Sequence, residues 1–269
     1  MISPDRFGFN APATRALEDT LSWASASGFQ HVDFNADRAP NGPQDFTPER
    51  VRAVRDLCAG AGLHIGIHTS SAVNNAEIAP LVGEAVDAYL RQNVELAARL
   101  GCEWVIVHGG FHFGDVPRRR EAAVARIKRL HEVAAEKKVP LWFENHNKEP
   151  QRAEIHYLPH NVEELRWFLD LPELFDSPWF RWSFNAAHAH LVPEGIPGFL
   201  DAFGVSRMAQ VRLTDNTGEY EVHLVPGLGN IDFPDLFRRL DRLGYGGPFS
   251  LDFGTDADKV RIRDSWLAG

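Results

Sequence analysis

Polar residues that could take part in catalysis or bind a metal ion lie at or near the ends of short apolar runs along the chain. They are His68, His108, Glu144, Asn185, Arg212 and Asp252. Imidazoles and carboxylates buried together in a dry pocket would repel one another or stay unpaired, which costs several kcal/mol unless a partner compensates. A divalent metal ion is such a partner, because it binds neutral imidazole and ionised carboxylate at once. The set therefore indicates a metal-assisted site.

The elements that must position these residues follow from the hydrophobic pattern. Eight runs are typical of strands: Phe7–Asn10, His31–Phe34, Leu63–His68, Trp104–His108, Leu141–Glu144, Phe180–Asn185, Gln210–Thr214 and Ser250–Phe253. Amphipathic stretches typical of helices lie between them: Thr14–Ala26, Pro48–Ala61, Glu77–Leu100, Arg118–Lys137, Asn161–Leu169 and Phe233–Leu243. A strand and a helix repeated eight times predict an α/β fold, a (β/α)8 TIM barrel.

A doubly wound open sheet is the alternative fold. Such a sheet normally has a glycine-rich phosphate loop after its first strand, and the sequence there reads FGFNAPAT. No linker or low-complexity tract interrupts the chain, so residues 1–269 are expected to form a single domain. Gly28, Gly62, Gly101 and Gly244 each precede a strand, where a helix-terminating glycine belongs.

The alternation of side chains along each strand decides which residues face the barrel interior. In the third run, Leu63, Ile65 and Ile67 share one face, and His64, Gly66 and His68 share the other. The apolar face is expected to pack against the outer helices. The polar residues then point into the barrel at the carboxyl ends of its strands, where active sites of barrels are built.

Composition and charge narrow the class of protein. The 269 residues are 44% hydrophobic, and 28 Lys plus Arg against 37 Asp plus Glu give a net charge of −9. This acidity argues against a nucleic-acid partner, although a local basic groove stays open. Two cysteines, no signal-peptide pattern in MISPDRFGFN and no membrane-spanning apolar run predict a cytoplasmic protein with no membrane partner.

Several stretches of the chain carry a family resemblance. They read IHTSSAVNNA, LGCEWVIVHGG, PLWFENHNKE, SFNAAHAHL, VRLTDNTGEYEVHLVPGLGNIDF and FSLDFG. With these motifs the sequence resembles the xylose isomerase-like barrel superfamily, which includes endonuclease IV and many sugar isomerases and epimerases. The resemblance covers nearly the whole chain, and its motifs are specific for the superfamily rather than for one activity within it.

The resemblance implies a divalent metal cofactor, zinc or manganese. One ion would be held by His68, His108 and Glu144. Another would be held by His188, Glu221 and His223, with Glu221 in place of an aspartate. The most general metal position of the superfamily uses the shared glutamate with Asp, His and Glu on the last strands. At these three positions this chain has Asn185, Arg212 and Asp252.

The Arg212 substitution has a physical interpretation. An arginine cannot be deprotonated and cannot bind a cation, but its guanidinium can fill the space of a missing ion and replace part of its charge. We expect Arg212 to form an ion pair with Glu144 or Asp252 where the metal would otherwise sit. Bidentate binding of a substrate carboxylate or phosphate by Arg212 is the alternative.

Further candidates are expected around the pocket. Asn10 and Asp33 face inward from the first two strands, and His112 and His146 follow the fourth and fifth strands in loops that rim the pocket. These four residues, together with Asn185 and Arg212, are predicted to contact substrate. For each of them a purely structural role is the competing interpretation.

Three functions are compatible with this pattern. The first is an isomerase, epimerase or lyase acting on a small polyhydroxylated substrate (a sugar, sugar acid or sugar phosphate) by proton abstraction next to a carbonyl, with Glu144, Asp252 and Arg212 as catalytic residues. The second is an endonuclease IV-like phosphodiesterase. The third is a non-catalytic ligand-binding barrel with a degenerate metal site. A homodimer is left open, because many barrels of this type pair.

Overall fold

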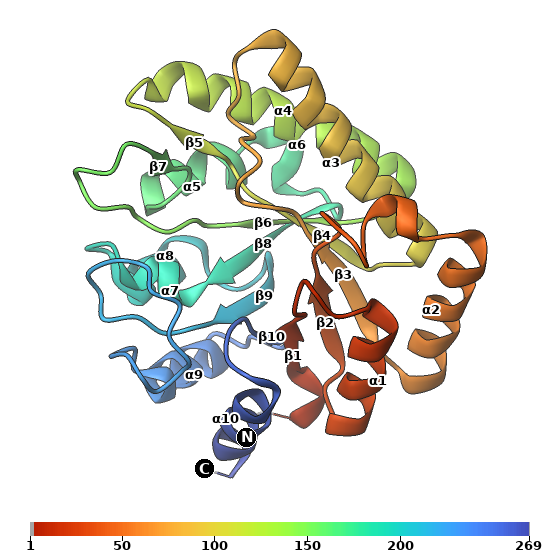
Figure 1. Cartoon of the computed structure of the whole chain (residues 1–269). Helices are drawn as coiled ribbons and strands as arrows, with labels where there is room; N and C mark the ends of the chain where they lie inside the picture. Colours follow the sequence, from red (N-terminus) through yellow and green to blue (C-terminus); the bar gives the residue numbers. More distant parts are fainter. Residues whose placement is uncertain (1–2, 269) are drawn as a thin grey trace.

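The computed structural model of the chain describes residues 3–268. Eight parallel strands close into a barrel in the order β1-β10-β9-β8-β6-β4-β3-β2 (Figure 1). The strands are β1 (Phe7–Asn10), β2 (His31–Phe34), β3 (His64–His68), β4 (Trp104–Val107), β6 (Leu141–Glu144), β8 (Phe180–Asn185), β9 (Met208–Leu213) and β10 (Phe249–Leu251). This arrangement confirms the predicted (β/α)8 barrel and rules out the open sheet.

Helices surround the strands. They are α1 (Leu17–Ser27), α2 (Pro48–Ala61), α3 (Pro80–Leu100), α4 (Val116–Lys137), α5 (Val162–Leu169), α6 (Pro172–Phe175), α7 (Ala186–His190), α8 (Gly195–Phe203), α9 (Phe233–Arg242) and α10 (Asp256–Leu267). The ends of α1, α2 and α3 are capped by Gly28, Gly62 and Gly101 in the left-handed conformation, as expected. Across residues 3–268, no helix combines the length and the apolarity that crossing a membrane requires.

A small two-stranded sheet beside the barrel mouth was not predicted. The strands β5 (Phe111–His112) and β7 (His156–Tyr157) pair antiparallel, with His112 opposite His156. Two-residue strands are too short to show a period, so the hydrophobic pattern could not reveal them. The small sheet matters because it brings Tyr157 to the same side of the barrel as the ends of β4 and β6.

The floor of the barrel consists of two stacked indoles. Trp104 and Trp142 lie parallel, with ring centroids 4.3 Å apart and 2° between their planes. Trp104 Nε1 donates a hydrogen bond of 2.6 Å to Asp33 Oδ1. Glycine at position 66 makes room for Trp104, since a Cβ there would lie 1.9 Å from its Nε1. The polar residues at the strand ends therefore rest on a rigid aromatic layer.

We predict that Gly66→Ala destabilises the protein by about 1–3 kcal/mol, because the added methyl group must displace the Trp104 indole. Chemical denaturation measures the effect. Gly60→Ala in α2 is the matched control: nothing lies within 4 Å of its added Cβ, so its stability should hold or rise by up to ~1 kcal/mol. Equal stability of the two variants would contradict the close packing at Gly66.

Candidate metal centre and active site

A polar cavity of about 300 Å³ lies at the carboxyl ends of the strands. Its lining contains Asn10, His68, Ser71, His108, Glu144, His146, Asn147, Glu149, Tyr157, Asn185, His188, Arg212, Glu221, His223, Asp252 and Phe253. These residues come from distant parts of the chain and meet because parallel strands end at one edge. Ser71, Asn147, Glu149, Tyr157 and Phe253 were not among the predicted site residues.

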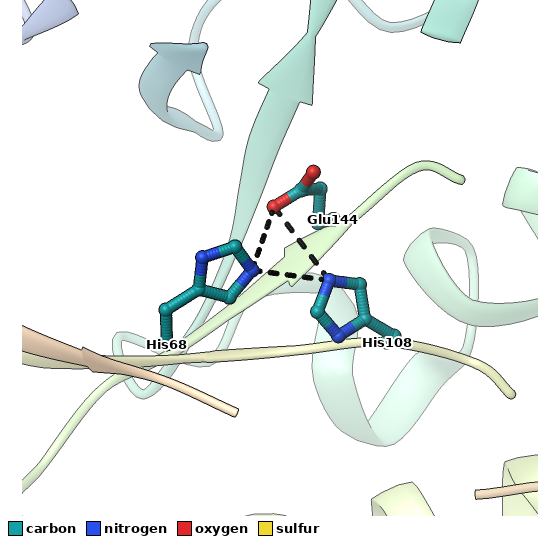
Figure 2. Close-up of side chains that lie close together, drawn as sticks. All are labelled: His68, His108 and Glu144. Atoms are coloured by element: carbon teal, nitrogen blue, oxygen red, sulfur yellow. Dashed lines mark hydrogen bonds and ion pairs between the residues drawn. The ribbon is translucent and has the colours of Figure 1, made fainter. Parts of the chain in front are cut away.

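Three of the predicted ligands converge in the cavity. His68 Nε2 lies 3.3 Å from His108 Nε2, and Glu144 Oε2 lies 3.5 Å from the first and 3.8 Å from the second (Figure 2). Ligands in a tetrahedron around zinc, with bonds of about 2.1 Å, are separated by about 3.4 Å. The spacing of these three atoms therefore fits a divalent metal ion with further coordination positions open.

Amide side chains hold the three ligands in place. Asn35 Nδ2 donates to the backbone oxygen of His68 at 2.7 Å, and Asn75 Nδ2 donates to that of His108 at 2.6 Å. Asn185 Nδ2 donates to Glu144 Oε1 at 2.9 Å, which leaves Oε2 turned toward the two imidazoles. Such supporting hydrogen bonds orient metal ligands before the ion arrives.

The protonation state of the imidazoles suits metal binding. Burial lowers the pKa of His108 to about 3, and burial together with the nearby Arg212 lowers the pKa of His68 well below its usual value. Both rings are therefore neutral at pH 7, and a neutral imidazole can offer a lone pair to a metal ion.

The second predicted ligand group is only partly assembled. His188 Nε2 lies 3.7 Å from Glu221 Oε2, whereas His223 Nδ1 lies 3.1 Å from the other oxygen, Oε1. His188 Nδ1 is 2.8 Å from the backbone oxygen of Asn145, so it donates there and leaves Nε2 free. Within residues 3–268, the group of three ligand atoms that converges within 4.8 Å is the one formed by His68, His108 and Glu144.

A buried carboxylate shapes the loop that carries Glu221 and His223. Asp215 is fully buried, and its Oδ2 accepts hydrogen bonds from the backbone N–H groups of Gly227 and Gly229 at 2.8 and 2.9 Å. A Cβ at Gly229 would lie 2.3 Å from Asp215 Oδ1, which explains the glycine. The Asp215 carboxylate therefore fixes the backbone of the loop at Gly227 and Gly229.

Arg212 lies at the centre of the site and is 1% exposed. Its Nη1 donates to Asp33 Oδ2 at 2.6 Å and Gln210 Oε1 at 3.0 Å, and its Nη2 donates to Asp252 Oδ1 at 2.7 Å and His68 Nδ1 at 3.2 Å. Its Nε lies 3.2 Å from Glu144 Oε2. The guanidinium thus forms ion pairs with both carboxylates named in the sequence interpretation and with a third, Asp33.

Arg212 and the carboxylates around it shift one another's pKa values. Burial raises the pKa of Glu144 to about 7 and that of Asp252 to about 6, and the nearby guanidinium opposes both shifts. Burial disfavours the charged guanidinium, yet Asp252, Glu144 and Asp33 outweigh that effect and raise the pKa of Arg212. Arg212 is therefore a permanent buried cation.

The residues around this cation do not fit the most general metal position of the superfamily. Arg212 has no lone pair to give. Asn185 Nδ2 is used by Glu144, and Asn185 Oδ1 accepts the backbone N–H of His188 at 3.1 Å. A guanidinium and an amide stand where a metal would need a histidine and a carboxylate.

Asn10, Asp33, His112 and His146 were also predicted to contact substrate, and two of these four line the cavity. Asn10 and His146 line the cavity. Asp33 instead lies beneath it and is 1% exposed, because Arg212 and Trp104 both bind its carboxylate. His112 belongs to the small sheet of β5 and β7, where its ring stacks on His156 at 5.5 Å and its Nδ1 accepts the N–H of Gly114. Asp33 and His112 are therefore not part of the cavity lining.

Some cavity residues had a signal in the sequence and some had none. Asn147 and Glu149 directly follow the predicted strand ending at Glu144, so the same argument about strand ends could have included them. Tyr157 reaches the cavity from the unpredicted two-stranded sheet of β5 and β7. Asn145 was missed because its role is indirect: its Oδ1 accepts the backbone N–H of Asn185 at 2.9 Å.

Comparison with known proteins agrees with this geometry. The family described as "Xylose isomerase-like TIM barrel" matches residues 21–267. The chain belongs to this family. Endonuclease 4 of Thermus thermophilus is 30% identical over 241 residues, which cover 82% of this chain and 83% of that protein.

Solved structures of the family share the fold. A D-tagatose 3-epimerase-like protein superposes with a TM-score of 0.82 at 21% identity, covering 98% of this chain and 96% of the other. The solved endonuclease IV of Thermus thermophilus gives a TM-score of 0.73 at 23% identity, covering 98% and 99%. Solved structures similar to this chain thus include both a D-tagatose 3-epimerase-like protein and an endonuclease IV.

We predict that Arg212→Met destabilises the protein by about 3–5 kcal/mol at pH 8, because Asp33, Glu144 and Asp252 lose their shared cation. Lowering the pH to 6 should restore part of the loss, since removal of the cation raises the carboxylate pKa values further and protonation then relieves the repulsion. Denaturant unfolding at the two pH values measures this.

Arg126→Met is the matched control. Arg126 is also buried but has one carboxylate partner, Asp87, which is partly exposed. Its loss of stability should be nearly the same at both pH values. A pH-independent loss in the Arg212 variant would contradict the assigned role of the guanidinium.

Proposed function

We propose that the protein is an isomerase, epimerase or lyase that acts on a small polyhydroxylated substrate by removing a proton next to a carbonyl group. One observation carries the proposal: the His68–His108–Glu144 group and the carboxylate of Asp252 line the same cavity of about 300 Å³. That volume lies at the small end of ligand pockets, about 300–1,000 Å³, and suits a single sugar.

His68, His108 and Glu144 would hold a zinc or manganese ion. When bound, such an ion acts as a Lewis acid that polarises a carbonyl oxygen. His68 would bind through Nε2, so Nδ1 would have to carry the proton and give up its hydrogen bond from Arg212 Nη2. Arg212 and the ion therefore favour different tautomers of His68: Arg212 favours the proton on Nε2, and the ion requires it on Nδ1.

Asp252 is the proposed base. Its Oδ1 accepts hydrogen bonds from Arg212 Nη2 at 2.7 Å and Ser250 Oγ at 3.2 Å, which fix the carboxylate and leave Oδ2 for the substrate. Burial raises its pKa to about 6, near the value that suits a base working at neutral pH. Arg212 acts through Asp252 and Glu144 as a positioning residue.

The charge of the cavity favours an uncharged substrate. Three of the four Nη hydrogens of Arg212 are bound to Asp33, Gln210 and Asp252, and metal binding would release only the one donated to His68. Arg212 therefore lacks the two free donors that bidentate binding of a substrate anion requires. Glu149 and Glu221 add negative charge to the lining. We therefore favour a free sugar over a sugar acid or sugar phosphate.

A second candidate function is phosphodiester hydrolysis. It is favoured by the 30% identity to Endonuclease 4 of Thermus thermophilus. The net charge of −9 and the guanidinium at the centre of the site argue against it. A ligand-binding barrel without turnover is the third candidate, and the first experiment below separates all three.

We predict that incubation with free ketoses and aldoses in D2O, after addition of Zn²⁺ or Mn²⁺, exchanges a carbon-bound proton next to the carbonyl for deuterium. Proton NMR follows the exchange. Asp252→Asn should lower the rate at least ~100-fold, because the base is lost. In the parent, the rate should fall as the pH drops below about 6, where Asp252 takes up a proton.

Asp264→Asn is the control for this experiment. Asp264 is exposed and pairs with Arg263 on α10, so exchange should be unchanged. Nicking of abasic-site DNA without sugar exchange would support the nuclease and contradict the proposal. Sugar binding without exchange or nicking would support the ligand-binding barrel.

We predict that His68→Ala and His108→Ala weaken binding of Mn²⁺ or Zn²⁺ by at least ~100-fold, because each removes a ligand from the convergent group. Elemental analysis and the rise in melting temperature on adding metal measure this, and a 100-fold excess over Kd corresponds to about 2.7 kcal/mol. His190→Ala, whose Nε2 contacts Asn230, is the control. Equal losses in all three variants would place the ion elsewhere.

A further inference from the structure

The imidazole of His146 is fixed in one orientation at the edge of the cavity. His146 follows β6 by two residues, is 4% exposed and lines the cavity. Its ring lies parallel to Tyr157, with centroids 3.9 Å apart and planes 3° apart. It is also parallel to His188 at 5.5 Å and lies 5.2 Å from the ring of His108. Stacking therefore leaves the ring little freedom to turn.

A short chain of hydrogen bonds assigns the proton on this ring. Asn147 Nδ2 donates to Glu149 Oε1 at 2.7 Å, so the carbonyl end of the same amide faces His146 Nδ1, at 2.6 Å. That contact is attractive only if Nδ1 carries the proton. The backbone N–H of Asn147 also lies 3.0 Å from Nδ1, but the shorter contact with the carbonyl oxygen decides the tautomer.

The other ring nitrogen is left without a partner. A neutral imidazole protonated on Nδ1 has its lone pair on Nε2. His146 Nε2 is buried and forms no hydrogen bond with any residue between 3 and 268. An unpaired buried acceptor is costly, and native proteins leave few of them unless a ligand or water supplies the missing partner.

A hydroxyl group suits the unpaired Nε2 of His146 better than a metal ion does. The convergent group of metal-ligating atoms consists of His68, His108 and Glu144, and His146 is outside it. Glu149, at the far end of the hydrogen-bond chain, is also part of the cavity lining. A lone pair in a cavity that is also lined by a carboxylate favours a group that donates a proton and carries no negative charge.

We propose that His146 is a substrate-positioning residue whose Nε2 accepts a hydrogen bond from a substrate hydroxyl, with Asn147 and Glu149 fixing the tautomer. The inference rests on the proposed function, since the hydroxyl belongs to the substrate of the same cavity. It assigns a specificity: a phosphate or carboxylate oxygen has no proton to donate at neutral pH and is rejected at this position.

The tautomer is tested without any substrate. Nitrogen-15 NMR of histidine-labelled protein, with His146→Gln to assign the ring, should show His146 protonated on Nδ1 and unprotonated on Nε2. Asn147→Leu removes the acceptor and should shift the proton to Nε2. A parent protein with the proton on Nε2 would overturn the inference.

The hydroxyl contact is tested by calorimetric binding to the Mn²⁺-loaded protein. The probes are D-tagatose, D-fructose and their singly deoxygenated derivatives. The parent should bind one deoxy derivative ~5- to 100-fold more weakly than its sugar. His146→Phe keeps the stacked ring without the acceptor and should reduce this discrimination to within ~2-fold, whereas His146→Gln should retain part of it.

The control is His112→Phe, which changes a stacked histidine outside the cavity and should keep the discrimination of the parent. Discrimination that survives His146→Phe overturns the inference, and so does a parent that binds none of the sugars. Failure of the proposed function looks different: the sugars bind with the expected discrimination, but no carbon-bound proton exchanges with D2O.

Discussion

The buried guanidinium of Arg212 is the interaction around which the mouth of this barrel is organised. It joins Asp33 of β2, Glu144 of β6 and Asp252 after β10 to its own strand, β9. Isolated, each carboxylate would be strongly destabilised by loss of water, and together they would repel one another. One permanent cation with a fixed fork of donors compensates all three and fixes their geometry.

The rest of the site depends on this arrangement. Arg212 binds Asp252 Oδ1, which leaves Oδ2 of that carboxylate for the cavity. Asn185 holds Glu144 Oε1, and Arg212 Nε lies 3.2 Å from Oε2, the oxygen that faces the two imidazoles. Below, Trp104 stacks on Trp142 and donates a hydrogen bond to Asp33. Above, amide side chains hold the backbone of His68 and His108, so the imidazoles point at one place.

Much of this could be predicted from the sequence, because a parallel barrel obeys two simple rules. Side chains alternate along a strand, and the polar ends of all strands meet at one edge, which is why His68, His108 and Glu144 could be brought together in advance. The helix over Pro48–Ala61 was predicted with its observed bounds, since Thr47 and Gly62 mark its two ends.

The errors have an equally physical origin. The alternation of side chains predicts that Asp33 and Arg212 face inward. It does not predict that Arg212 binds Asp33 and holds it beneath the cavity. Two-residue strands are too short to show a period, so the sequence pattern did not reveal the small sheet that contains His112 and brings Tyr157 to the cavity. Residues that act through backbone contacts, such as Asn145 and Asn75, have no chemical signature of their own in a single sequence.

The central guanidinium also bears on which metals can disturb this protein in a cell. Divalent sites of nitrogen and oxygen ligands follow a common order of affinity, in which copper outcompetes manganese and the other first-row ions. A site built on a bound ion is therefore open to mismetallation whenever the supply of metals changes. A cation that is covalently part of the chain cannot be exchanged, so the central charge of this barrel is independent of metal supply. An ion held by His68, His108 and Glu144 would be open to that competition.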